Sequence, residues 1–165
     1  MRWPTVWKRH GDCSAVSDLR DLYQELILDH NRKPRNFGPL AEANRSARGI
    51  NPLCGDKVTV HLQVEDGHVK DIRFEGTGCA ISIASASVMT ESLKRQTRED
   101  AVALFERFHR MVAPADGAES DPPGMGKLAA FAGVRDYPAR VKCATLAWHT
   151  LRAALDGEEK AVSTE

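Results

Sequence analysis

Apolar and polar residues alternate with a period of two along residues 56–76, the most regular pattern in the chain. This period is typical of β-strands with one buried face. The apolar positions before the break are Val58, Val60, Leu62 and Val64, and those after it are Val69, Ile72 and Phe74. Asp66-Gly67 lies between the two runs and is a strong signal for a tight turn. The pattern predicts an antiparallel hairpin whose second strand contains a bulge or phase shift, and a preceding strand is possible near residues 45–50.

The rest of the chain shows helical periods. The stretch "SDLRDLYQELILDH" begins with Ser17 as a plausible N-cap, and its helix should stop near Pro34. Four further helices are predicted: one after Cys79, one capped by Thr97, a short one in "MGKLAAFAGV", and one from Pro138 to about Leu155. From residue 156 onward we expect a frayed tail.

This order of elements predicts an α+β fold, in which a small antiparallel sheet of about three strands packs against helices. A chain of 165 residues suits one domain with a modest core. We expect a flexible extension over residues 1–16, a single domain over residues 17–157 and a C-terminal tail over residues 158–165.

Composition narrows the possible partners. Hydrophobic residues make up 42% and charged residues 28% of the chain, and the formal net charge is +0. No basic stripe with interleaved aromatic residues is present, so nucleic acid is not an expected partner. No apolar run approaches the roughly 18 residues of a membrane span, and residues 1–18 lack the apolar core of a signal peptide. We therefore expect a cytoplasmic protein without a membrane partner.

The four cysteines are the candidate chemistry of the chain. They are Cys13, Cys54, Cys79 and Cys143. Without a CxxC pair, and in a reducing compartment, they are expected to be thiols or metal ligands rather than disulfides. If the segment holding Cys54 and Asp56 is extended, these side chains project to the same side and converge. Cys79 follows a Gly-Thr-Gly sequence that suits a tight turn, at a predicted helix N-terminus that favours a thiolate.

Cys143 is harder to assign. The apolar stripe of the last helix consists of Val141, Ala144, Trp148, Leu151 and Leu155. Cys143 lies roughly 120° from the centre of that stripe, which argues against a simple core cysteine. Together with Cys54, Asp56 and Cys79 it would make a site of three sulfur donors and one oxygen donor, suited to zinc, iron or an iron–sulfur cluster. The spacing leaves open that the cysteines are instead buried as small hydrophobic residues.

Four stretches of the chain resemble the U-type iron–sulfur cluster assembly proteins, the IscU/SufU/NifU N-terminal family. They are "LYQELILDHNRKPRNFGPL", "NPLCGDKVTVHLQV", "FEGTGCAISIASASVMTE" and "YPARVKCATLAWHTLRAAL", in the family's order and over roughly residues 19–155. Each candidate ligand lies inside its own longer motif. The resemblance implies an α+β fold of the SufE/NifU type and favours a shared metal site.

Two features place the resemblance closest to the SufU branch. IscU-type scaffolds, which build a [2Fe–2S] cluster, carry a histidine directly before the third cysteine and a Leu-Pro-Pro-Val-Lys chaperone motif just ahead of it. Here Lys142 precedes Cys143, and the stretch reads "YPARVK". SufU-type proteins have lysine at this place and an insertion before the last helix, which "PADGAESDPPGMGKLAAFAGV" matches in length and place.

Resemblance to SufU implies a zinc-dependent sulfurtransferase. Carried over to this chain, zinc is held by Cys54, Asp56, Cys79 and Cys143. Cys54 is then the catalytic residue, which leaves the metal and accepts persulfide sulfur from a SufS-type cysteine desulfurase, and downstream SUF assembly proteins are further partners. Arg140 matches a family position associated with the partner interaction.

Two other functions stay open at this point. One is a scaffold that assembles and transfers a [2Fe–2S] cluster, in which Asp56 favours release of the cluster and iron replaces zinc. The other is a zinc-stabilised interaction domain without chemistry of its own. Cys13 matches no family position and is expected to be a free thiol in the N-terminal extension.

Overall fold

The computed structural model describes residues 20–113, 124–157 and 161–163. A helix over residues 20–32 comes first. The elements after it are β1 (Arg45–Asn51), β2 (Asp56–Glu65), β3 (His68–Thr77), α2 (Ala80–Leu93), α3 (Arg98–Val112), η1 (Gly126–Asp136), α4 (Pro138–Asp156) and β4 (Val162–Ser163). The predicted cap Ser17, Cys13, the extension over residues 1–16 and most of the predicted tail lie outside the described residues. In the described ranges, no helix is both long and apolar enough to cross a membrane.

The sheet has four strands in the order β3-β2-β1-β4. β1 pairs antiparallel with β2, and β2 pairs antiparallel with β3. Asp66 and Gly67 both have positive φ angles, 52° and 75°, as the tight turn of a two-residue hairpin requires. The register shifts between Gln63 and Val64, so that Lys70 is skipped in the ladder and forms a bulge. The predicted α+β class, the hairpin with its phase shift and the strand near residues 45–50 are confirmed.

Strand β4 differs from the expected frayed tail. Val162 and Ser163 pair in parallel with Gly49 and Ile50 of β1. Without them, this part of β1 would be an open edge whose N–H and C=O groups have no strand partner. Two residues are too few to show an alternating pattern, so the sequence gives no sign of this strand.

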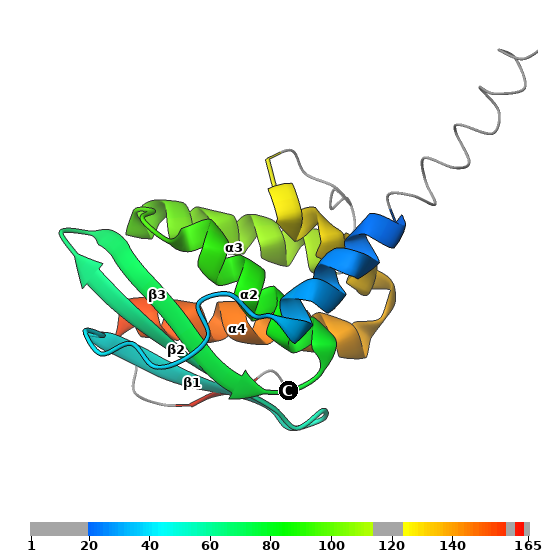
Figure 1. Cartoon of the computed structure of the whole chain (residues 1–165), viewed down its shortest axis with the longest axis horizontal. Helices are drawn as coiled ribbons and strands as arrows, with labels where there is room; N and C mark the ends of the chain where they lie inside the picture. The colour runs from blue at the N-terminus through cyan, green and yellow to red at the C-terminus, as the bar shows by residue number, and fades with distance from the viewer. Residues whose placement is uncertain (1–19, 114–123, 158–160, 164–165) are drawn as a thin grey trace, which may run out of the picture.

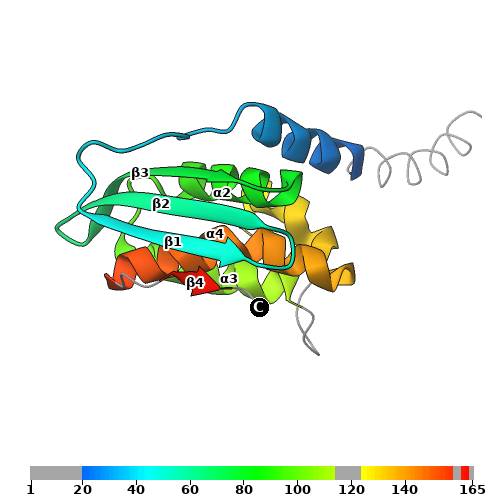
Figure 2. The same ribbon diagram turned by 90° about the horizontal axis from the view of Figure 1, so that it is seen from below.

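The helices lie on one face of the sheet (Figures 1 and 2). α4 packs against β1 and β2, α2 packs against β3 and α4, and α3 and η1 form a further layer against α4. The largest side chains of the core are aromatic, and Phe108 stacks on Trp148 with ring centroids 4.6 Å apart. The layering makes α4 the central helix of the domain. The short helix predicted before α4 is the 3₁₀-helix η1.

The central position of α4 overturns the prediction of a single apolar stripe. Every residue from Cys143 to Trp148 is buried, including those away from the stripe. Because the sheet, α2 and the α3–η1 layer enclose α4, its side chains do not sort into one buried and one exposed face. Cys143 is therefore 0% exposed, although it stays outside the cluster of apolar core residues.

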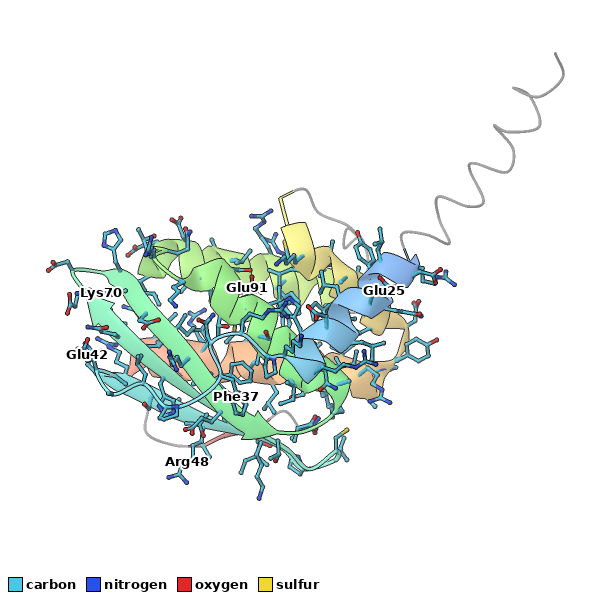
Figure 3. The ribbon with its side chains drawn as sticks, viewed as in Figure 1. Glu25, Phe37, Glu42, Arg48, Lys70 and Glu91 are labelled. Carbon is cyan, nitrogen blue, oxygen red and sulfur yellow. The ribbon has the colours of Figure 1, made fainter. Side chains whose placement is uncertain are left out.

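The first helix ends ahead of Pro34 as predicted and is attached to α2 through polar contacts. His30 Nδ1 lies 2.7 Å from Ser87 Oγ, and His30 Nε2 lies 3.4 Å from Glu91 Oε1. The chain then crosses to the sheet, where Phe37 packs edge-on against Phe74 of β3. Figure 3 shows Glu91 on α2 and Phe37 beside β3, at the two places where this segment is attached.

Candidate metal centre

Three segments that are far apart in sequence meet at one end of the sheet: the turn between β1 and β2, the start of α2 and the start of α4 (Figures 1 and 2). Sγ of Cys54, a carboxylate oxygen of Asp56 and Sγ of Cys143 lie within 4.8 Å of one another. Cys79 adjoins them, with its Sγ 3.9 Å from Asp56 Oδ2. The fold brings the four predicted ligands together, and their binding of a metal stays a prediction.

The turn over residues 52–55 places Cys54. Gly55 has a φ of 71°, which favours glycine, and its N–H donates a 2.8 Å hydrogen bond to the carbonyl of Asn51. The segment is thus a turn and not extended, so the expected alternation of side chains does not apply. The reversal of the chain brings Cys54 beside Asp56 instead, and it leaves Cys54 exposed.

Asp56 is the buried acid of the cluster, with 0% exposure. Its Oδ1 accepts a 2.9 Å hydrogen bond from the backbone N–H of Cys79. Cys79 is the N-cap of α2, so the carboxylate lies at the positive end of the helix dipole. These interactions offset part of the cost of burying a carboxylate.

The two glycines of the Gly-Thr-Gly sequence before Cys79 allow the end of β3 to pack closely against β2. Neither Gly76 nor Gly78 has a positive φ, so the expectation of a tight turn at these glycines is wrong. A Cβ atom on Gly78 would lie 2.6 Å from Asp56 Oδ1, and one on Gly76 would collide with the backbone carbonyl of Lys57. Both glycines let the end of β3 approach β2 and Asp56 closely.

Cys143 joins the cluster from the second turn of α4. Its Sγ lies 3.5 Å from Sγ of Cys54 and 3.5 Å from the backbone carbonyl of Ala139. Burial raises the pKa of the Cys143 thiol, and its hydrogen bonds to Asp56 and Cys54 act in the same direction. Without a cation in the cluster this sulfur is a neutral thiol, whereas a coordinated metal would deprotonate it.

Asn51 is a residue of this cluster that the sequence analysis missed. It is the last residue of β1, pairs with Asp56 in the ladder and is 0% exposed. Its Nδ2 donates a hydrogen bond to Cys143 Sγ at 3.6 Å. An asparagine before a proline is typical of a turn, so the sequence suggested an exposed loop residue at this position. The alternation along β1 could have shown that Asn51 is buried, because it continues the row of buried residues formed by Ala47 and Gly49.

Two of the donor separations are close to those of a tetrahedral zinc ion, whereas Cys79 lies outside the group of donor atoms that are all within 4.8 Å of one another. With Zn–S bonds of about 2.3 Å and Zn–O bonds of about 2.0 Å, the ligand atoms lie about 3.5–3.8 Å apart. The Cys54–Cys143 sulfur separation is 3.5 Å, and the Cys79–Asp56 sulfur–oxygen separation is 3.9 Å. Iron and iron–sulfur clusters also accept thiolate-rich donor sets. The four residues therefore fit the predicted groups without selecting one of them.

Two cations lie on α4 near Cys143. Arg140 is exposed in the first turn of the helix, and Lys142 is half-buried. Both carry positive charge on the helix that holds Cys143, and this charge would favour a cluster that is negative with three thiolates and one carboxylate. The interface role expected for Arg140 stays a prediction. Among the residues that the structure describes, no histidine belongs to the cluster.

The sequence of the chain is similar to one group of known proteins. Residues 22–155 match the family model of the NifU-like N terminal domain. The chain is 38% identical over 147 residues to the zinc-dependent sulfurtransferase SufU of Bacillus subtilis, which covers 88% of this chain and 97% of that protein. It is 36% identical over 141 residues to the iron–sulfur cluster assembly scaffold protein IscU of Streptococcus pyogenes serotype M1, with 86% and 87% covered.

A solved structure supports the same likeness. The crystal structure of the N-terminal part of a nitrogen-fixing NifU-like protein from Brucella abortus matches with a TM-score of 0.74 and 29% sequence identity. The match covers 84% of this chain and 95% of that one. The fold and the sequence thus point to the same group of proteins.

Proposed function

The chain belongs to the family of NifU-like N-terminal domains, the U-type iron–sulfur cluster assembly proteins, and we propose that it is a zinc-dependent sulfurtransferase of this group. In this proposal Cys54 accepts persulfide sulfur from a SufS-type cysteine desulfurase. Zinc is held by Cys54, Asp56, Cys79 and Cys143. The sulfur then passes to downstream SUF assembly proteins in the cytoplasm, where thiols stay reduced.

The observation that carries the proposal is the uneven exposure of the cluster. Cys54 is exposed, Cys79 is half-buried and Cys143 is buried. A persulfide on a partner protein can reach Cys54 without opening the domain, but it cannot reach Cys143. Gly55 beside it has no atom within 4 Å of an added Cβ position, so this side of the turn is open to solvent. An exposed thiol on an open turn suits an acceptor that must detach and attack.

The chemical step transfers one sulfur atom. Bound zinc would keep the cysteines deprotonated and protected from oxidants. The Cys54 thiolate attacks the outer sulfur of the desulfurase persulfide, and a new sulfur–sulfur bond forms as the old one breaks. The desulfurase cysteine leaves as a thiolate, and Cys54 becomes the persulfide. No net oxidation or reduction occurs, because the sulfane sulfur only changes its carrier.

The surface around Cys54 supports docking of a protein partner. Leu53, next to Cys54 in the turn, is 69% exposed, and Tyr137 at the start of α4 is 65% exposed. Large apolar and aromatic side chains of this kind are typical anchors at protein interfaces. Arg140, one turn from Tyr137, would add a charged contact to the desulfurase. We propose that these residues surround the point where sulfur is handed over.

A cluster scaffold is the second candidate. The chain is as similar to the scaffold IscU of S. pyogenes as to the SufU of B. subtilis, at 36% and 38% identity. The same four donors would hold a [2Fe–2S] cluster, with iron in place of zinc. In that case Asp56 favours release of the cluster. Lys142, the residue that SufU-type proteins carry before the third cysteine, favours the sulfurtransferase.

An assay of a SufS-type desulfurase separates the two candidates. Alanine release from cysteine is measured with and without the zinc-loaded protein under mild reductant. A sulfur acceptor stimulates release, the Cys54→Ala variant does not, and Cys13→Ala serves as the cysteine control. Absence of stimulation, together with a visible cluster when iron and sulfide are supplied, would establish the scaffold instead. Stimulation that survives Cys54→Ala would indicate an interaction domain without chemistry of its own.

A further inference from the structure

The two buried side chains at the base of the β1–β2 turn are Asp56 and Asn51. Asp56 is one of the four candidate ligands, and Asn51 is not. Asn51 nevertheless contacts the cluster, because its Nδ2 donates to Cys143 Sγ across 92 positions of sequence. Its Oδ1 is buried and has no hydrogen-bond partner in the described part of the chain. The hydrogen bond that the structure shows for this buried side chain is thus the one from its amide N–H group.

The hydrogen bond distinguishes Cys143 from Cys54. For Cys54, the sulfur contact that the structure shows is the one with Cys143 at 3.5 Å, and no N–H group is seen donating to it among the described residues. A hydrogen bond from an N–H group stabilises a thiolate relative to the neutral thiol, which favours the anionic form that binds a metal. A thiolate stabilised in this way is also a weaker nucleophile. The sulfur that accepts this bond is therefore the one that stays in place.

We propose that Asn51 is a positioning residue, which holds Cys143 as a fixed ligand and thereby leaves Cys54 as the thiolate that exchanges. The inference rests on the proposed metal site. It assigns to Asn51 a selection between two sulfur atoms that are otherwise alike in chemistry and 3.5 Å apart. Exposure alone explains which cysteine a partner reaches, whereas the hydrogen bond from Asn51 explains which cysteine dissociates from the metal.

The backbone of Asn51 supports this role. Its carbonyl accepts the hydrogen bond from Gly55 that closes the turn, and its Cα is paired with that of Asp56. One residue therefore fixes the base of the turn and one end of the Cys143 contact. The turn carrying Cys54 can move above this base while Asp56 and Cys143 keep their places.

The test measures zinc affinity by chelator competition and uses Co²⁺ as a spectroscopic probe, so it does not depend on activity. Asn51→Leu removes the amide and keeps a similar shape. We expect zinc to bind roughly 10- to 100-fold more weakly. The sulfur-to-Co²⁺ charge-transfer band should move to lower energy, because the sulfur orbitals lose the stabilising N–H group. The control is Asn44→Leu, since the side chain of Asn44 bonds the backbone of Val64, at the far end of β1 from the cluster.

Background variants show whether the effect acts through Cys143. Asn51→Leu should cause no further loss of zinc affinity in a Cys143→Ala background, which has no acceptor for the amide, and should cause its full loss in a Cys54→Ala background. Equal losses in both backgrounds, or an affinity and a band position equal to those of Asn44→Leu, would overturn the proposal. If Asn51→Leu does not fold, Asn51→Ala replaces it, since it also lacks the N–H donor and adds no charge. If the wild type binds neither Zn²⁺ nor Co²⁺, the proposed metal site itself is wrong.

Discussion

The backbone N–H of Cys79 donates a 2.9 Å hydrogen bond to the buried carboxylate of Asp56. This bond joins the first residue of β2 to the N-cap of α2, so two candidate ligands from different elements share one fixed geometry. Gly78 permits the contact, because it is the residue over which the carboxylate lies. The position of Asp56 therefore depends on a glycine that carries no chemistry.

Substitution of Gly78 should disturb the cluster. In Gly78→Ala the new Cβ would lie 2.6 Å from Asp56 Oδ1, and a carboxylate at 0% exposure has little room to retreat. We expect a loss of about 1–3 kcal/mol in the free energy of unfolding, with weaker zinc binding. Urea denaturation measures the first effect. Gly133→Ala is the control, because nothing lies within 4 Å of its Cβ position, and equal midpoints for the two variants would contradict the account.

Removal of zinc should destabilise the domain. A ligand that binds only the folded state adds stability, about 2.7 kcal/mol when its free concentration is one hundred times its Kd. Thermal unfolding should therefore shift to lower temperature after chelation and recover as zinc is added back. Asp56→Ala should lose most of this dependence. A wild-type Tm that does not respond to zinc would be evidence against a folded-state metal site.

Ser85 should stabilise the contact between the helices that carry Cys79 and Cys143. Its Oγ donates to the carbonyl of Ala144 at 2.6 Å and accepts from Trp148 Nε1 at 3.2 Å. Ser85→Ala leaves the buried indole N–H without this acceptor, which should cost about 1–3 kcal/mol. Urea denaturation again measures the loss.

The matched control for Ser85→Ala is Ser92→Ala in the same helix. Ser92 Oγ bonds the carbonyl of Val88 within α2, so its loss affects no contact between helices. We expect a clearly smaller change than for Ser85→Ala. Similar changes for both serines would show that the bond between α2 and α4 contributes little.

Stability should fall as the pH drops through the range in which histidine protonates. Burial lowers the pKa of His30 below its ordinary value of 6.5; the Arg35 guanidinium adds to this, and Glu91 opposes it. The unfolded chain then binds the proton more readily than the folded one, so stability decreases below about pH 6.5 until the folded pKa is passed. Burial also lowers the pKa of His149, with a contribution from His109.

His30→Gln should flatten part of this dependence, and His149 should account for a remainder. Urea midpoints measured between about pH 5 and 8 give the slope. His68→Gln, on the exposed turn of the hairpin, is the control for replacing a histidine. An unchanged slope in His30→Gln would show that the contact with α2 does not depend on the charge of His30.

Regular elements with a clear period were predictable from the sequence. The hairpin, its bulge and the helix cap at Thr97 all rest on local signals, and the structure has them: Thr97 accepts from the N–H of Asp100. The grouping of the candidate ligands was anticipated from their positions at the edges of elements. The resemblance of their motifs to one family strengthened that expectation.

Features that depend on three-dimensional enclosure were not predictable. The periodicity of a single helix predicted that Cys143 lies away from the buried face. The sheet and the layer of α3 and η1 enclose α4, so Cys143 is buried, and a single helix carries no information about this enclosure. The Gly-Thr-Gly sequence suggested a turn, whereas Gly78 is there for the approach of Asp56. Asn51 was hidden for the same reason, since its partner Cys143 lies 92 residues away.

The most direct measurement of the central claim is the position of the transferred sulfur. The zinc-loaded protein is incubated with a SufS-type desulfurase and cysteine, alkylated, and mapped by peptide mass spectrometry. The account predicts that the added sulfur lies on the peptide of Cys54, and that Cys54→Ser gains none while still binding the desulfurase. Sulfur on Cys79 or Cys143, or undiminished transfer to Cys54→Ser, would contradict the account.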